Sequence, residues 1–449
     1  MKNKSMNKIL ALGVVAAMTA GMLAGCGSSA STTDGAAAGT EAASNSAASN
    51  GEVPTLVWWT IGGTPADDFD QAVSQISDYA EEKIGVRIDV KIAGWADYET
   101  KMNNIINTGE YFDLMFVNNT NYTKFVNLNA LENITDLVQT ETPDLYNFIP
   151  ADLWEGAKIH GNVYAVPTYK DSSLTQFWML DDAYVQKYNI DVDSIKDYAT
   201  LNDALQTIKE GEGKSKYPMQ LAQGSTFNGF FNNYDGLASG LQPLPIFGSA
   251  QGWPAAATTW AFNSGIEKYD LTQVFGPLYT TETIQGSMNA ISANSKYKTE
   301  ALKVLQLMNT DSKFRDMCAY GTEGNYMEYA EDGTVQKLRD DWNWPSYTQG
   351  TFFILSTQAD GDPDAWNQVK EQNEAAVSST CLGFALDVTN IQNEIANCNT
   401  VWDKYKNDLL TGASDPATAV PACIEELKAA GLDTVIEEAQ KQVDEFFAN

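Results

Sequence analysis

The chain has 449 residues, with 28 Lys and Arg against 59 Asp and Glu, so its formal net charge is −31. A field of that sign repels phosphate backbones and anionic headgroups, which argues against nucleic acid and anionic lipid as partners. The length exceeds what one hydrophobic core usually serves and predicts two lobes.

The N-terminal region has the features of an export signal. Three lysines precede an uncharged apolar run over residues 9–23. As a helix this run would reach about 22 Å, short of the roughly 30 Å hydrocarbon core, so residues 1–25 are predicted to be a signal peptide and not an anchor. No later apolar run approaches transmembrane length.

The end of this signal, Leu23-Ala24-Gly25-Cys26, resembles the lipobox of bacterial lipoproteins, in which the cysteine is acylated and begins the mature chain. The resemblance implies lipidation of Cys26 and attachment to the extracytoplasmic face of a bacterial membrane by the lipid alone. Ordinary cleavage with an incidental cysteine is the alternative. Residues 27–50 are mostly Ser, Ala, Gly, Thr and Asn, so we expect residues 26–53 to be a flexible tether reaching about 25 to 30 Å.

Regular elements begin at residue 55. Residues 55–60 and 113–117 are predicted strands, and residues 86–92 alternate as a third. Apolar spacing predicts helices over 67–83 and 98–107. The order β-α-β-α-β implies a parallel sheet, whose ligands bind beyond the carboxyl ends of the strands. That rule selects Trp59, Thr60, Asn118 and Asn119.

Later elements are less regular. After a turn at Gly161-Asn162, residues 164–167 form a predicted strand that leads through Tyr169-Lys170-Asp171 into a crossover between lobes. Helices are predicted over 181–188, 201–209, 299–309, 390–410, 421–430 and 434–447, and a strand over 288–291. Residues 223–265 show little periodicity.

Five stretches together resemble the family 1 extracellular solute-binding proteins of ABC importers, in a subgroup with a characteristic C-terminal region. They are residues 161–167, 286–291, 320–324, 382–384 with Asp387, and 429–442. The resemblance implies an α/β clamp of two lobes, each a mainly parallel sheet flanked by helices, joined by a hinge of several crossovers. Lobe 1 would comprise residues 54–165 and 280–330, and lobe 2 residues 166–279 and 331–449. Compared with similar proteins, lobe 2 is shortened near 247–248.

The resemblance also implies a carbohydrate ligand and ABC permease partners. Binding a saccharide requires flat apolar faces and planar hydrogen-bonding groups. The candidate ligand residues are Trp59, Thr60, Asn118, Tyr169, Lys170, Asp171, Trp178, Trp260, Asn289, Glu323 and Trp344. Any of these tryptophans could instead pack a core, and Lys170 and Asp171 could form a hinge ion pair.

Enzymatic and metal-binding templates find little support. His160 is the one histidine, and neither H-E-x-x-H nor G-x-S-x-G occurs. Asp360, Asp362, Asp364 and Glu371 have the spacing of a calcium loop, but a helix capped by Asp362 explains them more simply. None of the later cysteines has C-x-x-C spacing, and their pairing stays open.

The sequence therefore predicts a monomeric, lipid-anchored solute-binding protein that captures a carbohydrate, in particular an oligosaccharide, by lobe closure, without catalysis, cofactor or metal. The alternatives are a binding protein for another solute such as a peptide, a surface glycoside hydrolase, and a surface protein that no longer takes part in transport.

Overall fold

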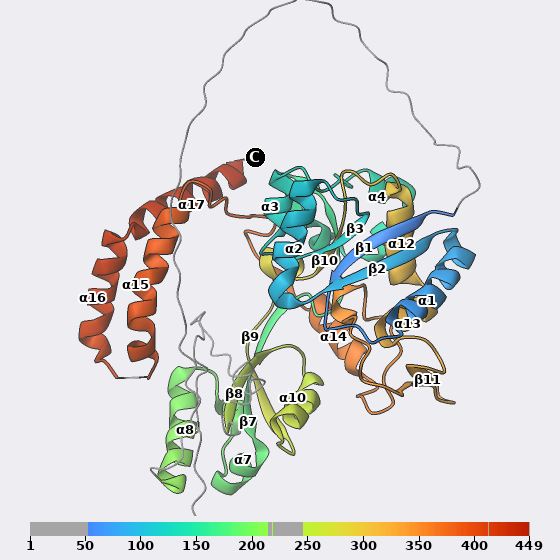
Figure 1. Cartoon of the computed structure of the whole chain (residues 1–449). Coiled ribbons are helices and arrows are strands. Elements are labelled where there is room, and N and C mark those ends of the chain that lie inside the picture. The colour runs from blue at the N-terminus through green and yellow to red at the C-terminus, as the bar shows by residue number, and fades with distance from the viewer. Residues whose placement is uncertain (1–52, 214–217, 219–245, 412, 449) are drawn as a thin grey trace, which may run out of the picture. The chain divides into compact units, whose positions relative to one another are not determined.

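The computed structural model describes residues 53–213, 218, 246–411 and 413–448, and residues from Val53 onward form one compact unit (Figure 1). The predicted signal peptide, Cys26 and most of the tether lie outside the described residues. Within the described part of the chain, no helix has the length and apolar character needed to cross a membrane.

The first sheet has five strands in the order β2-β1-β3-β10-β6. These are β1 (Thr55–Ile61), β2 (Arg87–Ala93), β3 (Leu114–Val117), β6 (Ala165–Pro167) and β10 (Met288–Ile291). The predicted parallel arrangement is confirmed for β1, β2 and β3. It does not extend to β10, which runs antiparallel to β3 and β6 because the chain returns to this sheet from its other end.

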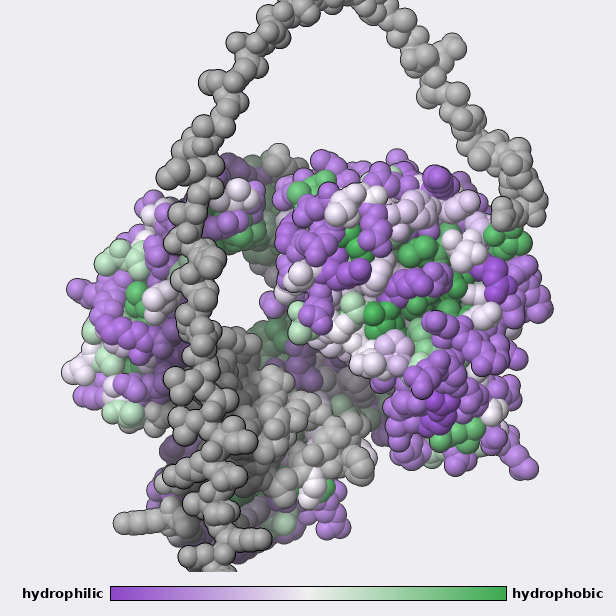
Figure 2. All heavy atoms as spheres, in the orientation of Figure 1, coloured by the Kyte–Doolittle hydropathy of each residue, from purple (hydrophilic) through white to green (hydrophobic). Residues whose placement is uncertain are grey.

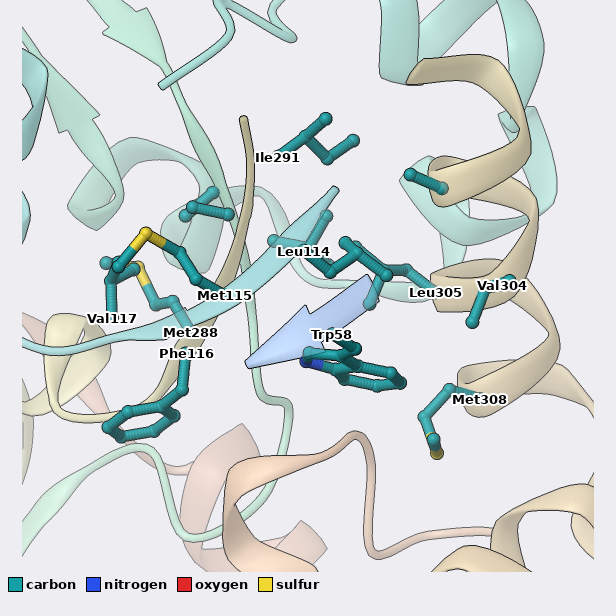
Figure 3. Close-up of a cluster of buried hydrophobic side chains, with 14 of the residues drawn as sticks. Trp58, Leu114, Met115, Phe116, Val117, Met288, Ile291, Val304, Leu305 and Met308 are labelled. Atoms are coloured by element: carbon teal, nitrogen blue, oxygen red, sulfur yellow. The ribbon is translucent and has the colours of Figure 1, made fainter. Parts of the chain in front are cut away.

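Helices on both faces bury the first sheet. On α1 (Phe69–Ile84) the predicted apolar positions are buried, and the helix ends at Gly85, whose φ of 69° suits glycine. The helix α2 (Trp95–Thr108) begins three residues earlier than expected. Figure 3 shows Trp58 between the sheet and α12 (Lys298–Thr310), from which Leu305 and Met308 reach toward it.

The second sheet has four strands in the order β13-β9-β7-β8. They are β7 (Leu174–Asp181), β8 (Phe247–Gln251), β9 (Tyr269–Tyr279) and β13 (Val377–Ser378). The prediction of a mainly parallel sheet is wrong here, because β7 runs antiparallel to both β8 and β9. The predicted short junction at 247–248 lies within β8, paired with β7, and the segment before it, residues 219–245, lies outside the described residues.

Alternate residues of β7 pack into separate cores. Trp178 and Leu180 join one cluster with α7 (Asp182–Tyr188) and α8 (Tyr198–Glu212). Phe177 and Met179 join another with α10 (Ala256–Ser264). The strand is therefore buried on both faces, as expected of the centre of a lobe.

The chain passes between the two sheets three times. It leaves β6 for β7, returns from β9 to β10 through α11 (Thr281–Gln285), and leaves again for β13. Asn373, at the end of α14 (Ala365–Glu374), joins two of these crossings: its side chain bonds to the backbone of Lys170 and Ser172, and its carbonyl accepts from the Tyr279 hydroxyl at 3.0 Å. The expected hinge of several crossovers is thus present.

The segment before α14 differs from its predicted place. The resemblance places residues 331–449 in the second lobe, but Trp342 and Trp344 belong to the core of the first sheet. The helix α14 begins at Ala365 and not after Asp362, whose carboxylate accepts instead from the amide of Asp364 at 2.8 Å. The predicted calcium-like spacing forms no cluster of metal ligands among the described residues.

The C-terminal region is helical, as predicted. It contains α15 (Gln392–Thr411), α16 (Pro416–Ala429) and α17 (Leu432–Ala448), and α16 begins five residues earlier than expected because Asp415 caps it and Pro416 starts it. Among the described side chains of these three helices, Cys423 is the buried one. Figure 2 shows the predominantly hydrophilic surface of one face of the molecule.

The remaining elements are short and connect the larger ones. They are α3 (Tyr122–Asn127), α4 (Leu137–Glu141), α5 (Pro143–Phe148), α6 (Ala151–Gly156), β4 (Lys158–Ile159), β5 (Asn162–Val163), η1 (Val192–Ser194), α13 (Ser312–Tyr320), β11 (Met327–Tyr329), β12 (Val335–Lys337) and η2 (Ser346–Thr348). The tight turn predicted at Gly161-Asn162 lies one residue earlier, at His160-Gly161. Cys318, Cys381, Cys398 and Cys423 are free thiols.

Candidate ligand-binding edge of the first sheet

One edge of the first sheet gathers the ends of all five strands. The register pairs Ile61 with Ala93, and pairs Met288 with both Val117 and Pro167. The carboxyl ends of β1, β2, β3 and β6 therefore meet the beginning of β10. In an α/β sheet this is where ligands bind.

Residues 343–349 run across this edge and are fastened to it. The amide of Gly63 donates to the Asn343 carbonyl at 3.2 Å. The Ser287 hydroxyl donates to the Tyr347 carbonyl at 2.6 Å, and the Asn289 amide group donates to the carbonyls of Thr348 and Gln349 at 2.9 and 3.0 Å. This segment is thus a fixed part of the edge.

Two aromatic rings stand exposed there. Trp95, the first residue of α2, is 55 % exposed, and Tyr347 in η2 is 38 % exposed. Their ring centroids lie 6.3 Å apart with an interplanar angle of 21°, and Phe116 packs edge-on behind Trp95. Partial burial raises the pKa of the Tyr347 hydroxyl, against the opposing effect of a hydrogen bond with the Trp95 side chain. The pair offers an open, flat apolar surface bordered by polar groups, which suits the C–H face of a sugar ring.

The loop after β3 supplies ordered polar groups. The Asn118 carboxamide oxygen accepts from the amide and hydroxyl of Thr120 at 3.0 and 2.7 Å, and the Asn118 amide donates to the Asn121 side chain at 3.0 Å. Asn119 points outward and contacts Glu282 at 3.4 Å. These bonds fix the loop and leave amide groups available at the surface.

Two cavities lie beside this region. One, of about 740 Å³, is lined by Asn119, Thr120 and Glu282 and by residues 384–389. The other, of about 880 Å³, is lined by residues that include Lys158, His160, Asp387, Gln442 and Phe446. Both are bounded on one side by the C-terminal region, and only the smaller one includes residues of the loop after β3, Asn119 and Thr120, in its lining.

Several predicted ligand residues are accessible. Asn118 lies at the edge, and Trp59 is half-buried beneath Lys101, whose ammonium lies 5.0 Å from the centre of its ring. Lys170 and Asp171 form an ion pair of 2.6 Å with side chains 18 % and 21 % exposed, which is the hinge contact considered as their alternative. Glu323 is exposed beside β11, away from the strand ends.

Other predicted ligand residues are buried, so direct ligand contact is not assigned to them. Thr60 and Asn289 hold residues 343–349 in place, and Trp344 packs edge-on against Trp58 with ring centroids 5.3 Å apart. Tyr169 packs against Phe353 and is 7 % exposed. Trp178 and Trp260 fill the two cores of the second lobe, as the packing alternative expected.

Trp95 and Tyr347 are not among the residues that the sequence predicts for the site. Trp95 follows the predicted strand 86–92 across Gly94, so the rule that selected Asn118 could have found it. Tyr347 has no comparable local signal, because long-range contacts bring its segment to the sheet.

Comparison with known proteins agrees with this architecture. A carbohydrate ABC transporter substrate-binding protein of Streptococcus pneumoniae is 26 % identical over 465 aligned positions, covering 90 % of this chain and 94 % of that protein. The crystal structure of the N-glycan transport solute binding protein NgtS from the same species has a TM-score of 0.75 at 24 % identity, covering 88 % of this chain and 99 % of that one.

The chain is thus similar over most of its length to extracellular solute-binding proteins of ABC transporters. A structure of NgtS in complex with Man5GlcNAc has a TM-score of 0.61 at 25 % identity, again covering 88 % of this chain and 99 % of that one. Residues 380–448 also match a family model described as "Domain of unknown function (DUF3502)". That match coincides with the helical C-terminal region of the chain.

Proposed function

We propose that this protein captures an oligosaccharide outside the cytoplasm and delivers it to an ABC importer. The observation that carries the proposal is the exposed, stacked pair of Trp95 and Tyr347 at the edge of the first sheet. Rings of this kind bind the apolar face of a pyranose, while neighbouring amides bind its hydroxyl groups. The complex of NgtS with Man5GlcNAc supports an extended saccharide as the ligand.

Capture would proceed by closure of the lobes on the ligand. Three chain crossings join the sheets, and a ligand that contacts both lobes stabilises the closed form by its differential affinity. The protein would act without catalysis, because its relatives are named as binding proteins and importer components. It would act as a monomer.

Attachment to the membrane would come from lipidation of Cys26 alone. A tether reaching about 25 to 30 Å would keep the folded part within reach of its permease. The strongly negative net charge repels anionic lipid, so the folded part has no electrostatic attraction to the membrane surface. The lipid on Cys26 would supply the attachment instead.

Isothermal titration of the purified protein with a panel of neutral oligosaccharides tests the proposal. We expect saturable binding of at least one glycan containing mannose, N-acetylglucosamine or glucose. Binding of peptides or amino acids with no response to any saccharide would overturn it. New reducing ends after incubation with a bound oligosaccharide would instead identify a glycoside hydrolase.

A further inference from the structure

Arg315, on α13, is completely buried, and all the acceptors of its guanidinium are neutral oxygen atoms in one short segment. Nε donates to the Thr351 carbonyl at 2.7 Å, and one terminal nitrogen donates to the Gln349 side chain at 2.6 Å. The other terminal nitrogen donates to the carbonyls of Ser346 and Gly350 at 3.0 and 3.3 Å. One side chain therefore binds four residues between 346 and 351.

Burying an arginine is energetically unfavourable, because its charged group loses its hydration. Burial lowers the pKa of Arg315 to about 10, so the side chain still carries its charge at neutral pH. An apolar side chain of similar volume would avoid the cost of dehydrating that charge. What the guanidinium adds is a rigid fork that fixes several carbonyl groups at once, which lysine cannot reproduce.

Ser287 and Asn289 also hold this segment through the carbonyls of residues 347–349, and Arg315 binds the carbonyls on either side of these. The segment includes η2, and the Gln349 side chain extends the same network by donating to the carbonyls of Cys318 and Trp344 at 2.7 and 3.1 Å. At Gly350 an added Cβ would lie 2.5 Å from Met308, so the backbone itself lies close against α12. The network therefore works together with the bonds from Ser287 and Asn289 to fix residues 346–351 on the first lobe.

Tyr347 is the residue that this segment presents to solvent. Its neighbour Ser346 is bound directly by Arg315, and its own carbonyl is bound by Ser287 at 2.6 Å. The ring consequently stands nearly parallel to Trp95, which comes from a different part of the chain.

We infer that Arg315 is a positioning residue for the ligand surface: it holds residues 346–351 so that Tyr347 stacks with Trp95. The inference rests on the proposed function for its ligand, but the stacking it predicts exists in the protein without ligand. Arg315 acts through the segment and does not itself reach the surface.

Asp316 provides a matched control. It is the next residue on α13, is 1 % exposed, and accepts from the amide and hydroxyl of Ser356 and from the Tyr329 hydroxyl. Its partners lie outside residues 346–351. Asp316→Asn should therefore disturb a buried polar network of similar size without moving Tyr347.

The test uses the full protein labelled with 5-fluorotryptophan, with the ¹⁹F resonance of Trp95 assigned by Trp95→Phe. Arg315→Met and Arg315→Lys should both shift or broaden that resonance, whereas Asp316→Asn should leave it in place at a comparable loss of melting temperature. Affinity for the oligosaccharide bound by the wild type should fall up to about tenfold in the Arg315 variants, the equivalent of losing one aromatic contact.

An unchanged Trp95 resonance in a folded Arg315 variant would overturn the inference, as would an equal shift in Asp316→Asn. If Arg315→Met does not fold, Arg315→Lys provides the test through the same Trp95 resonance. This variant keeps the positive charge but loses the guanidinium that binds several acceptors at once. A wild type that binds no saccharide overturns the proposed function, while the resonance still decides whether Arg315 positions the pair.

Discussion

Trp95 and Tyr347 stack at a centroid distance of 6.3 Å although one begins α2 and the other lies in η2. Neither segment creates this surface alone. The tertiary structure produces it by laying residues 343–349 across the ends of the strands, and it leaves both rings open to solvent.

Replacing Trp95 by alanine should weaken oligosaccharide binding by about tenfold or more and leave the melting temperature almost unchanged. The reason is that the ring is 55 % exposed, so its removal creates little buried cavity but deletes a stacking face. Titration calorimetry and thermal melts measure the two quantities. Phe447→Ala is the control, because Phe447 is 60 % exposed on α17 and lies outside the edge. Equal loss of affinity in both variants would contradict the site.

Replacing Trp344 should have the opposite effect. The residue is fully buried against Trp58, so Trp344→Ala should lower the free energy of unfolding by about 3 to 5 kcal/mol. Trp344→Phe should cost less, because it keeps a ring and removes an indole N–H that has no hydrogen-bond partner among the described residues. Urea unfolding measures both. A Trp344→Ala protein of wild-type stability with lost affinity would return this residue to the ligand site.

The stability contributed by Asp68 should depend on pH. The Arg339 guanidinium, followed by Tyr326 and Asn325, holds the pKa of the Asp68 carboxyl well below its usual range. A carboxylate with a depressed pKa stabilises the folded state above its unfolded pKa of about 3.9, and this contribution is lost as the pH falls through and below that value.

The difference in unfolding free energy between wild type and Asp68→Asn should therefore be larger at pH 7 than at pH 3, measured by urea titration at each pH. Asp340→Asn serves as the control, since that side chain is 96 % exposed beside Lys337. A difference for Asp68→Asn that does not change with pH would show that the carboxylate gains nothing from its partners in the folded state.

Replacing Cys26 by serine should release the protein from the membrane. The expectation follows from the signal and its final four residues. Fractionation of cells and labelling with radioactive palmitate measure the outcome, with Cys381→Ser as a control that should remain membrane-bound and labelled. Membrane association of the Cys26→Ser protein without label would point to a different anchor.

The first sheet could be predicted from sequence because its signals are local. The helix over Phe69–Ile84 buries one face and the strand Arg87–Ala93 alternates, so period and pairing agree. In the second lobe β7 is buried on both faces and has no alternation to detect. The strand β9 runs through Gly276-Pro277, a dipeptide typical of turns, and its pairing with β7 is irregular nearby.

The sequence could predict where on the sheet the candidate site lies, but not which side chains form it. The rule on strand ends selects Asn118, which lies at the edge. The choice of tryptophans relied on residue type and selected Trp178, Trp260 and Trp344, which are core residues. The solvent exposure of a tryptophan side chain decides whether it can contact a ligand or packs in a core. That exposure depends on contacts between segments that are distant in the sequence. Tyr347 reaches the edge through bonds to its segment from Ser287, Asn289 and Arg315, and all three residues lie at least 30 positions away in the sequence.

The bonds of Asn373 have a consequence for how the clamp works. By joining the crossing at residues 170–172 to the one at Tyr279, this side chain makes two strips of backbone bend together. Two independent pivots would permit twisting and partial closing, each a way to lose the cargo. Coupled pivots permit a single rotation, so we expect the lobes to close on the ligand in one cooperative step. We also expect substitutions of Asn373 to shift the equilibrium between open and closed forms, although this residue does not contact the ligand.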